Sequence, residues 1–383
     1  MTRSTAPRIA IIGAGLAGLT LARVLHVNGI EAAVYDRDAS AHGHPQGGML
    51  DIHEESGQAA LRAAGLFEEF RTLIHVGGEA MRILDKHATV RMEDDGFGVR
   101  PEVNRRSLRD LLLGSLPAGA MRWGSKVTGA RTLADGRHEV ALADGATFTA
   151  DLLIGADGAW SRVRPLVSDA TPLHCGVSFV EAHLLDADLR HADAAAVVGR
   201  GLLFALSEEK GIIAHRDPDG QLHVYIALKT PADWGRTIDG ADTDTIKAML
   251  LAHFAGWDTQ LQSLITGADG ALIPRAVYAL PVGHHWDRTP GVTLVGDAAH
   301  LMSPFAGEGA NLAMQDGAEL ALALAAHPHD TETALAAYEQ DLFPRGEAAA
   351  AMSASNLVIS FRPDAPRGLL DLMARYGAGA GVA

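Results

Sequence analysis

The sequence predicts an α/β fold in two domains, one built on a doubly wound parallel sheet and one rich in other strands. Three observations predict it. An apolar run of buried-strand type, residues 9–12, leads directly into a glycine-rich turn and an apolar helical stretch through Leu25. Two more buried-strand runs, at 151–154 and 292–295, each end in glycine and acid residues. Residues 172–273 change to strand patterns, which indicates the second domain.

The composition is that of a large globular protein. Its 383 residues, 48% of them hydrophobic, are enough to bury most of the unfolded surface in two domains. The net charge of −15 argues against nucleic acid or an anionic membrane as a partner. Because the chain has neither an apolar signal core nor a run of about 18 apolar residues, we expect a cytoplasmic location. Cys175 is the only cysteine, so any redox chemistry needs an organic cofactor.

The glycine turn follows the pattern GxGxxG in the setting that a dinucleotide site requires. Gly13 permits a tight turn, Gly15 lets the backbone approach a pyrophosphate, and Gly18 lets the helix pack closely on the strand. Leu16 and Ala17 stand at the helix N-terminus, where free N–H groups face the phosphates. These features predict a Rossmann-like domain.

A second strand and an acid complete the dinucleotide pattern. The sequence Asn28-Gly29 ends the helix, and residues 32–35 form the next strand. Asp36 then stands where a ribose-binding acid belongs, with Arg37 beside it. A chance glycine turn would not bring all of these elements in this order, so we favour dinucleotide binding.

A helix with a basic start follows later in the same domain. Asn104, Arg105 and Arg106 precede a helical run at 108–116, although positive charge opposes the helix dipole at this end. Either a bound anion or a solvated basic face would explain the pattern, and the residues alone do not decide between them. Asp51, which precedes this helix in the sequence, is either a solvent-exposed residue or part of a functional site.

Two further motifs end strands at 151–154 and 292–295. The first is Asp157-Gly158, and the second runs from Gly296-Asp297 through Pro304 to a helix that begins near Gly309. Since ligands bind at the carboxyl ends of strands in a doubly wound sheet, we expect all the motifs to meet on one ligand.

A flavin suits the second of these motifs. Asp297 can accept hydrogen bonds from a polyol such as the ribityl chain, and the helix near Gly309 directs N–H groups at an electron-rich ring edge. His300 is either a base or a histidine packed within the motif, and we favour the packed histidine.

The second domain contains a strand with two distinct faces. Residues 222, 224, 226 and 228 form an apolar face, and His223 lies on the opposite face, as a substrate contact or a surface histidine. We expect a discontinuous cofactor domain, a sheet-rich substrate domain and a C-terminal helix. Their expected ranges are 6–75, 98–170 and 273–330 for the first, 76–97 and 171–272 for the second, and 331–383 for the third.

The three motifs together resemble those of the class A flavoprotein monooxygenases of the aromatic hydroxylase type. The likeness rests on the turn at 13–18, on Asp157-Gly158 extended through Arg164, and on Gly296-Asp297. Within that family, residues 47–53, 103–105, 229–234 and 296–311 are similar to the tetracycline-inactivating monooxygenases.

The resemblance implies the cofactors and their contacts. It implies non-covalent FAD, with NADPH or NADH as electron donor. The implied FAD residues are Gly13, Gly15, Leu16, Ala17, Gly18, Asp36, Arg37, Gly48, Asp51, Arg105, Asp157, Gly158, Gly296, Asp297, Pro304, Gly307, Gly309, Ala310 and Asn311. The implied NAD(P)H residues are His44, Asp157 and Arg164, and the implied substrate residues are Glu181, Leu202, His223, Pro304, Phe305 and Gly307.

The implied activity is hydroxylation of an aromatic, phenolic or polyketide molecule by O₂ through a flavin C4a-hydroperoxide. Because the flavin carries the chemistry, we expect no catalytic side chain and no metal, in a monomer. The alternatives are an FAD-dependent reductase of the prenyl-reductase type and a non-catalytic flavin-binding regulator.

Three departures from the tetracycline enzymes affect the expected substrate. Leu202 and Glu181 stand where those enzymes have arginine and glutamine, and His44 replaces another arginine. Since leucine cannot bind the polar oxygen arrays that arginine recognises, we expect tetracycline to be a poor or altered substrate. The resemblance taken alone implies tetracycline degradation and antibiotic resistance, and the three replacements argue against that activity.

Overall fold

The computed structural model describes residues 8–41, 43, 47–96 and 98–379. Its first sheet is parallel throughout and has the strand order β17-β11-β1-β2-β7. The strands are β1 (Ile9–Ile12), β2 (Ala32–Tyr35), β7 (Met121–Arg122), β11 (Leu152–Gly155) and β17 (Val292–Leu294). Strands β1 and β11 in the interior of the sheet read as continuous apolar runs because both faces of this sheet are covered.

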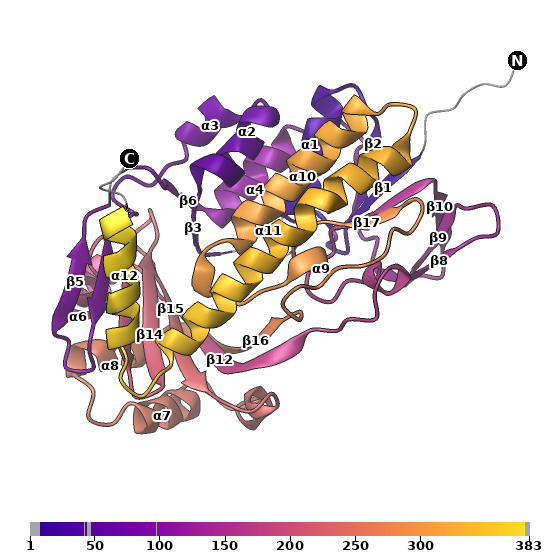
Figure 1. Ribbon diagram of the computed structural model, residues 1–383. Coiled ribbons are helices and arrows are strands. Elements are labelled where there is room, and N and C mark those ends of the chain that lie inside the picture. The colour runs from indigo at the N-terminus through magenta and orange to yellow at the C-terminus, as the bar shows by residue number, and fades with distance from the viewer. Residues whose placement is uncertain (1–7, 42, 44–46, 97, 380–383) are drawn as a thin grey trace, which may run out of the picture.

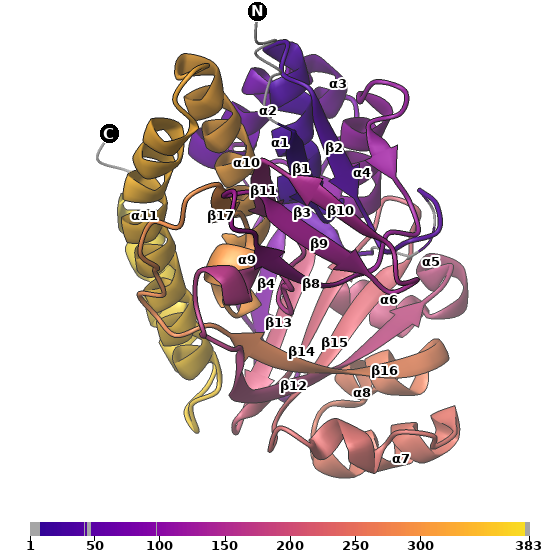
Figure 2. The same ribbon diagram turned by 90° about the vertical axis from the view of Figure 1, so that its right-hand side faces the viewer.

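Helices cover one face of the parallel sheet, and a small antiparallel sheet covers the other (Figures 1 and 2). The helices are α1 (Leu16–Val27), α2 (Ala59–Ala63), α3 (Phe67–Arg71), α4 (Arg105–Gly114) and α10 (Gly309–Ala326), with a π-helical turn at Glu54–Gln58. The small sheet consists of β8 (Val127–Thr132), β9 (His138–Leu142) and β10 (Thr147–Ala150). The predicted Rossmann-like domain is therefore confirmed.

The second domain is built on a seven-stranded mixed sheet in the order β16-β12-β15-β14-β13-β4-β5. Its strands are β4 (Met81–Leu84), β5 (Val90–Asp94), β12 (Leu173–Leu184), β13 (Leu202–Ser207), β14 (Lys210–Arg216), β15 (Leu222–Lys229) and β16 (Asp269–Ala279). The predicted faces of β15 are correct, because Leu222, Val224, Ile226 and Leu228 all lie in one apolar core. The boundary expected between residues 272 and 273 falls inside β16, so we place it after Ala279.

Four helices complete the outer side of the second domain: α5 (Ala187–Arg190), α6 (Ala192–Val198), α7 (Thr243–His253) and α8 (Thr259–Thr266). Helix α7 begins after the capping residue Asp242, whereas no sequence pattern marks the other three helices. They are short, and α6 is so rich in alanine that it shows little helical periodicity.

The C-terminal segment forms two helices where one was expected, namely α11 (Thr331–Ser360) and α12 (Arg367–Gly379). Helix α11 runs obliquely across the molecule from the parallel sheet to the second sheet (Figure 1). Near its start, the Tyr338 hydroxyl donates a hydrogen bond to the Leu294 carbonyl oxygen of β17. Near its end, Leu357 packs with Val177 and Phe179 of β12. None of the helices in the described ranges has the length and hydrophobicity of a membrane span.

Short elements join the two domains where they meet. Strands β3 (Met49–Asp51) and β6 (Glu102–Asn104) form a two-stranded antiparallel ribbon. A short helix, α9 (Asp297–His300), follows β17, and a 3₁₀ turn at Pro304–Ala306 leads into α10. Two further 3₁₀ turns lie at Arg164–Leu166 and Trp234–Thr237.

Candidate active site

The glycine turn between β1 and α1 is closely packed at two glycines and open at the third. A Cβ atom on Gly13 would lie 2.3 Å from the Ala156 carbonyl oxygen, and one on Gly18 would lie 2.1 Å from the Gly13 carbonyl oxygen. A Cβ atom on Gly15 would meet nothing within 4 Å. The turn and packing roles predicted for Gly13 and Gly18 follow from these distances, and the backbone at Gly15 faces free space.

Asp36 closes this turn from the end of β2. Its Oδ2 atom accepts a hydrogen bond from the Ala14 N–H at 2.7 Å, and its Oδ1 atom accepts one from the Asp38 N–H at 2.8 Å. Arg109 of α4, which the sequence analysis missed, is buried and donates to the Ala14 and Ala41 carbonyl oxygens. Its partners are backbone atoms far away in the sequence, so no local signal marks it. Arg37 is exposed.

The first turn of α1 packs closely against the middle of α10 because glycines occupy the contacts between the two helices. A Cβ atom on Gly317 of α10 would lie 2.5 Å from the Ala17 carbonyl oxygen of α1. One on Gly296 would touch Ala17 at 3.1 Å and Ala313 of α10 at 3.2 Å. Among the described residues, no side chain caps either N-terminus. Both helices thus present unpaired N–H groups at their N-termini.

The motif at Gly296-Asp297 exposes its acid. Asp297 is exposed, whereas residues 291–296 and 298–300 on either side of it are buried. No described residue donates a hydrogen bond to its carboxylate group. The carboxylate is therefore available to a ligand at the end of β17.

Arg164, which the resemblance implied as an NAD(P)H contact, joins the two later motifs by hydrogen bonds. The side chain is 3% exposed, and its guanidinium donates hydrogen bonds to the Ala298 carbonyl oxygen at 2.8 Å and the Ala159 carbonyl oxygen at 2.9 Å. Asp157, expected to serve both cofactors, has its two carboxylate oxygens bonded to Ser161 and Arg162 within its own loop. We therefore assign both side chains to holding the Asp157-Gly158 loop beside the Gly296-Asp297 motif. The expected NAD(P)H residue His44 lies outside the described residues.

Asp51, which the resemblance implied as a cofactor contact, lies next to the start of α10. A Cβ atom on Gly307 would lie 3.4 Å from the Asp51 carboxylate. The amide of Asn311 donates to the Asp51 carbonyl oxygen at 2.9 Å and accepts from the His53 N–H at 2.9 Å. The buried ring of His53, which the sequence analysis missed, bonds to Asp51 and faces Glu308. These contacts fix the loop before α10 against β3.

The basic start of α4 carries a free cation. Asn104 caps this helix by accepting hydrogen bonds from the Arg106 and Ser107 N–H groups. The Arg105 N–H donates to the Gly48 carbonyl oxygen at 3.0 Å. No described residue forms an ion pair or hydrogen bond with the Arg105 guanidinium group. This arrangement supports the interpretation in which an anion binds here.

The residues around these helix ends fit a flavin dinucleotide. The open backbone at Gly15, the uncapped end of α1 and the free Arg105 guanidinium suit a pyrophosphate. The exposed Asp297 carboxylate suits the hydroxyl groups of a ribityl chain. The uncapped end of α10, where Gly309 leaves open space, suits a ring edge that gains negative charge on reduction.

An aromatic and polar surface of the second sheet faces this region. Phe179 packs against Tyr225, with ring centroids 5.3 Å apart, and against Phe305 of the Pro304 turn at 6.0 Å. The Phe305 carbonyl oxygen accepts a hydrogen bond from Asn356, so α11 helps to hold this turn. The turn expected to contact substrate thus lies against one edge of the same sheet surface.

The structure brings Glu181 and His223 together and adds a cation. His223 is 1% exposed, so the interpretation of a surface histidine is wrong. Its Nε2 atom lies 2.9 Å from the Oε1 atom of Glu181, whose Oε2 atom lies 2.8 Å from the Nε atom of Arg275. Arg275, on β16, was not predicted. Leu202 lies on the same sheet face but is separated from His223 by His215 of the intervening strand.

His300 is a packed motif histidine, as expected. Its Nε2 atom lies 2.6 Å from the Asp316 Oδ2 atom inside the protein, and Asp316 also pairs with Arg345. The carboxylate raises the pKa of His300 even though burial of the ring opposes this effect. These three side chains join α9, α10 and α11.

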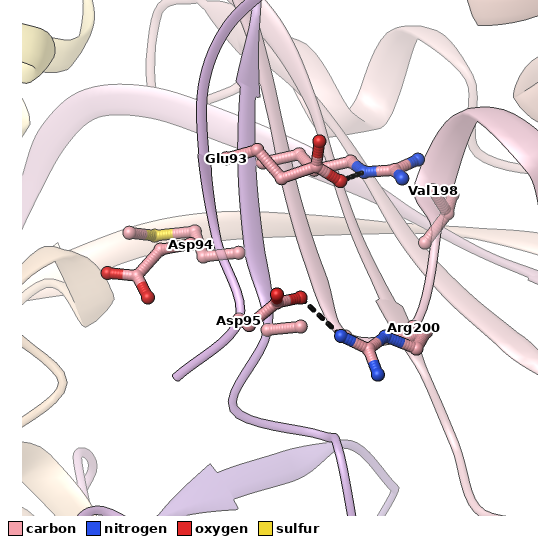
Figure 3. A pocket seen from close by; sticks show the side chains of 9 residues that line it. Glu93, Asp94, Asp95, Val198 and Arg200 are labelled. Carbon is pink, nitrogen blue, oxygen red and sulfur yellow. Dashed lines mark hydrogen bonds and ion pairs between the residues drawn. The ribbon is translucent and has the colours of Figure 1, made fainter. Parts of the chain in front are cut away.

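A small surface hollow at the edge of the second sheet holds ion pairs and none of the predicted site residues. Figure 3 shows that Glu93 of β5 points toward one guanidinium group and Asp95 toward that of Arg200. The hollow has a volume of about 20 Å³, which is enough for about one water molecule.

The fold and the site define a dinucleotide-dependent enzyme of the α/β class with a separate substrate domain. The chain matches the family described as FAD binding domain over residues 7–353, and it belongs to this family. It is 31% identical to monooxygenase asqM of Emericella nidulans over 94% of this chain and 97% of that protein. It is 30% identical to 3-amino-4-hydroxybenzoate 2-monooxygenase PtnB3 of Streptomyces platensis over 88% and 85%. The chain is an FAD-dependent monooxygenase.

Solved structures share the fold. HpxO of Klebsiella pneumoniae, complexed with FAD and uric acid, superposes with a TM-score of 0.78 at 23% identity over 96% of this chain and 91% of that one. Tetracycline destructase Tet(51) superposes with a TM-score of 0.68 at 21% identity over 91% and 90%. The family match and the curated relatives confirm the predicted monooxygenase family, whereas the likeness to the tetracycline enzymes is a distant one of fold and does not support tetracycline degradation or resistance.

Proposed function

We propose that this monooxygenase uses NADPH or NADH and O₂ to hydroxylate an aromatic or heteroaromatic molecule that carries a hydroxyl or acidic N–H group. The observation that carries the proposal is the surface formed by Phe179, Tyr225, His223 and Glu181, opposite Phe305. Its aromatic rings suit a planar substrate, and its one polar edge suits a single polar substituent.

The names of related proteins support the same substrate class. The PtnB3 relative is named for an aminohydroxybenzoate, and the HpxO structure contains uric acid, a heteroaromatic molecule with acidic N–H groups. Both molecules are flat and ionisable. A molecule of this kind would place its ring among the aromatic side chains and its acidic group at His223.

Bound flavin supplies the hydride acceptance and oxygen activation of the reaction. The protein supplies cofactor binding, charge stabilisation and exclusion of water. The free N–H groups of α1 and Arg105 hold the dinucleotide, and Asp297 holds its sugar chain. The end of α10 stabilises negative charge at the ring edge, and the aromatic surface keeps water away from the reacting carbon. The chain has one GxGxxG motif, so we propose that the nicotinamide nucleotide binds transiently at the surface.

The test is a screen for substrate-stimulated NADPH oxidation coupled to oxygen uptake. The panel contains 3-amino-4-hydroxybenzoate, uric acid, simple phenols, bicyclic phenols and tetracycline, and ¹⁸O₂ labels the product for mass spectrometry. We expect one class of ionisable aromatic molecules to be hydroxylated with one labelled oxygen atom. We expect little turnover of tetracycline, because Glu181 is already paired with Arg275 and leucine occupies position 202. NADPH oxidation that yields a reduced product without labelled oxygen would contradict the proposal.

A further inference from the structure

His223 has one paired and one unpaired ring nitrogen inside the protein. Its Nε2 atom lies 2.9 Å from the Oε1 atom of Glu181. Its Nδ1 atom is buried and has no hydrogen-bond partner among the described residues. Buried polar atoms are almost always paired in folded proteins, so the unpaired nitrogen requires an explanation.

The partner of Nε2 decides which nitrogen carries the proton. Glu181 also pairs with Arg275, and the hydrogen bond with His223, followed by that with Arg275, lowers the pKa of Glu181 to about 2 despite burial. An ionised carboxylate only accepts hydrogen bonds, so the proton of the neutral His223 ring belongs on Nε2. The Nδ1 atom is then a free acceptor.

This acceptor points to the place where the two domains meet. A Cβ atom on Gly48 would lie 3.5 Å from the His223 Nδ1 atom and 3.9 Å from the Tyr225 hydroxyl oxygen. Gly48 directly precedes β3. The last residue of β3 is Asp51, which contacts the loop before α10. A donor that entered between Gly48 and the sheet would reach His223 from the side where the cofactor domain lies.

We propose that His223 is the catalytic proton acceptor for the substrate, with Glu181 and Arg275 as its positioning residues. The inference rests on the proposed function and narrows its substrate class to molecules with an acidic O–H or N–H group. The bond from that proton to the substrate oxygen or nitrogen breaks, and an N–H bond forms at Nδ1. The substrate becomes an electron-rich anion, the imidazole becomes an imidazolium beside ionised Glu181, and the proton returns to the product before release. No oxidant or reductant takes part in this step.

The other titratable groups near His223 do not compete for this role. Burial lowers the pKa of His183, and lowers that of His215 to about 4, so both rings are weak proton acceptors. Burial raises the pKa of the Tyr225 hydroxyl to about 12 and raises that of Asp217. Among the described residues, the titratable groups near His223 are Glu181 and His183 on β12, His215 on β14, Asp217 after it, Tyr225 on β15 and Arg275 on β16, with Arg105 of α4 near Tyr225. Glu181 is thus the anion in direct contact with His223.

The test measures the ionisation of a bound probe and needs no turnover. The oxidised, FAD-loaded protein is titrated with 7-hydroxycoumarin and with 4-nitrophenol across a pH series, because the neutral and anionic forms of each probe absorb at different wavelengths. We expect the ionisation midpoint of the bound probe to lie below that of the free probe. Glu181→Gln should raise the midpoint by about one pH unit, which is a tenfold loss of preference for the anion. Glu181→Asp should recover part of the shift, and His223→Gln should remove it.

Two controls separate proton transfer from simple packing. The probe 7-methoxycoumarin has the same ring but no proton to give, so its affinity should change little in Glu181→Gln. The variant Glu93→Gln removes a carboxylate of the edge strand β5 that pairs with Arg82 at 2.6 Å, and three strands of the sheet separate β5 from β15, so this variant should leave every midpoint unchanged. Flavin content and circular dichroism show whether each variant has folded.

Each remaining outcome overturns the inference. An unchanged midpoint in Glu181→Gln would show that the carboxylate does not support proton transfer. An equal loss of affinity for 7-methoxycoumarin would show that it only shapes the site. Failure of both acidic probes to bind the parent protein would reject the substrate class. Because no NADPH is present, the titration can succeed where the hydroxylation screen fails, and the reverse is also true.

Discussion

The Nε2 atom of His53 lies 2.8 Å from the Oδ2 atom of Asp51. The other ring nitrogen lies 3.4 Å from Glu308, so the imidazole sits between two carboxylates that belong to different parts of the cofactor domain. Burial by itself would lower the pKa of His53, but the hydrogen bonds to Asp51 and then Glu308 raise it to about 9. The ring is therefore charged at neutral pH and holds β3 to the loop before α10.

This charge makes the stability of the protein depend on pH. The pKa of His53 is raised from 6.5 to about 9 on folding, so its contribution is complete below pH 6.5 and is lost as the pH rises through 9. The difference corresponds to roughly 3 kcal/mol. In urea unfolding across this range, the free energy of unfolding of the parent should fall with rising pH. The free energy of unfolding of His53→Gln should fall less steeply. Equal slopes would show that His53 is not charged in the folded protein.

The ionisation of Glu102 should also make the free energy of unfolding fall as the pH rises. Burial, followed by the charges of Asp51 and Glu79, raises its pKa from 4.5 to about 9, so the folded protein keeps a proton that the unfolded chain releases. Its contribution is complete below pH 4.5 and is lost as the pH rises toward 9. At pH 7, Glu102→Gln should therefore increase the free energy of unfolding by about 1–3 kcal/mol. The exposed Glu68→Gln serves as control, and destabilisation by Glu102→Gln would contradict the assignment.

Two glycines of the same turn should respond differently to a methyl group. Gly18→Ala places a Cβ atom 2.1 Å from the Gly13 carbonyl oxygen, so the protein should lose about 2 kcal/mol or more of stability with or without FAD. Gly15→Ala meets open space, so flavin-free protein should lose less than about 1 kcal/mol. Its affinity for FAD should fall at least tenfold, because the methyl group occupies the approach of the pyrophosphate. Thermal unfolding and flavin fluorescence titration measure the two effects, and unchanged FAD affinity in Gly15→Ala would place the pyrophosphate elsewhere.

Asp297 should matter for the cofactor and little for the fold. No described residue bonds to its carboxylate, so Asp297→Ala should unfold at nearly the parent temperature without FAD. Hydrogen bonds to a charged group contribute roughly 1.5–3 kcal/mol, so FAD should dissociate about tenfold or more readily. Asp316→Asn is the contrasting variant, because this buried acid pairs with His300 and Arg345 and its loss should lower the unfolding temperature. If Asp297→Ala retains FAD as tightly as the parent, this acid does not hold the sugar chain.

The sequence allowed the elements formed by local contacts to be predicted. The segment from β1 through α1 to Asp36 and the alternating faces of β15 depend on neighbouring residues, and each is as expected. Asp51 was implied as a cofactor contact only by the resemblance to the flavoprotein monooxygenases, and no local pattern indicated its contact with the start of α10.

Residues whose partners are distant in the sequence could not be predicted. Glu181 and Arg275 are 94 residues apart and meet only because β12 pairs with β16. Arg109 donates a hydrogen bond to a carbonyl oxygen 95 residues away. No sequence pattern marks His53, because its partner Glu308 is distant in the sequence. The boundary near residue 273 was misplaced because the apolar pattern does not show which sheet a strand joins.

The course of α11 has a consequence for biosynthesis. The residues that complete the flavin site, from β17 through α10, leave the ribosome about 140 residues after β11, and α11 emerges later still. During that interval the edge of β11 that will pair with β17 is unprotected, and the loop at Phe305 lacks its support from Asn356. A nascent chain therefore has to delay its final folding until the late helices are made. Riboflavin supply during expression should then decide how much of the newly made protein escapes aggregation, since FAD can stabilise only chains that have reached this stage.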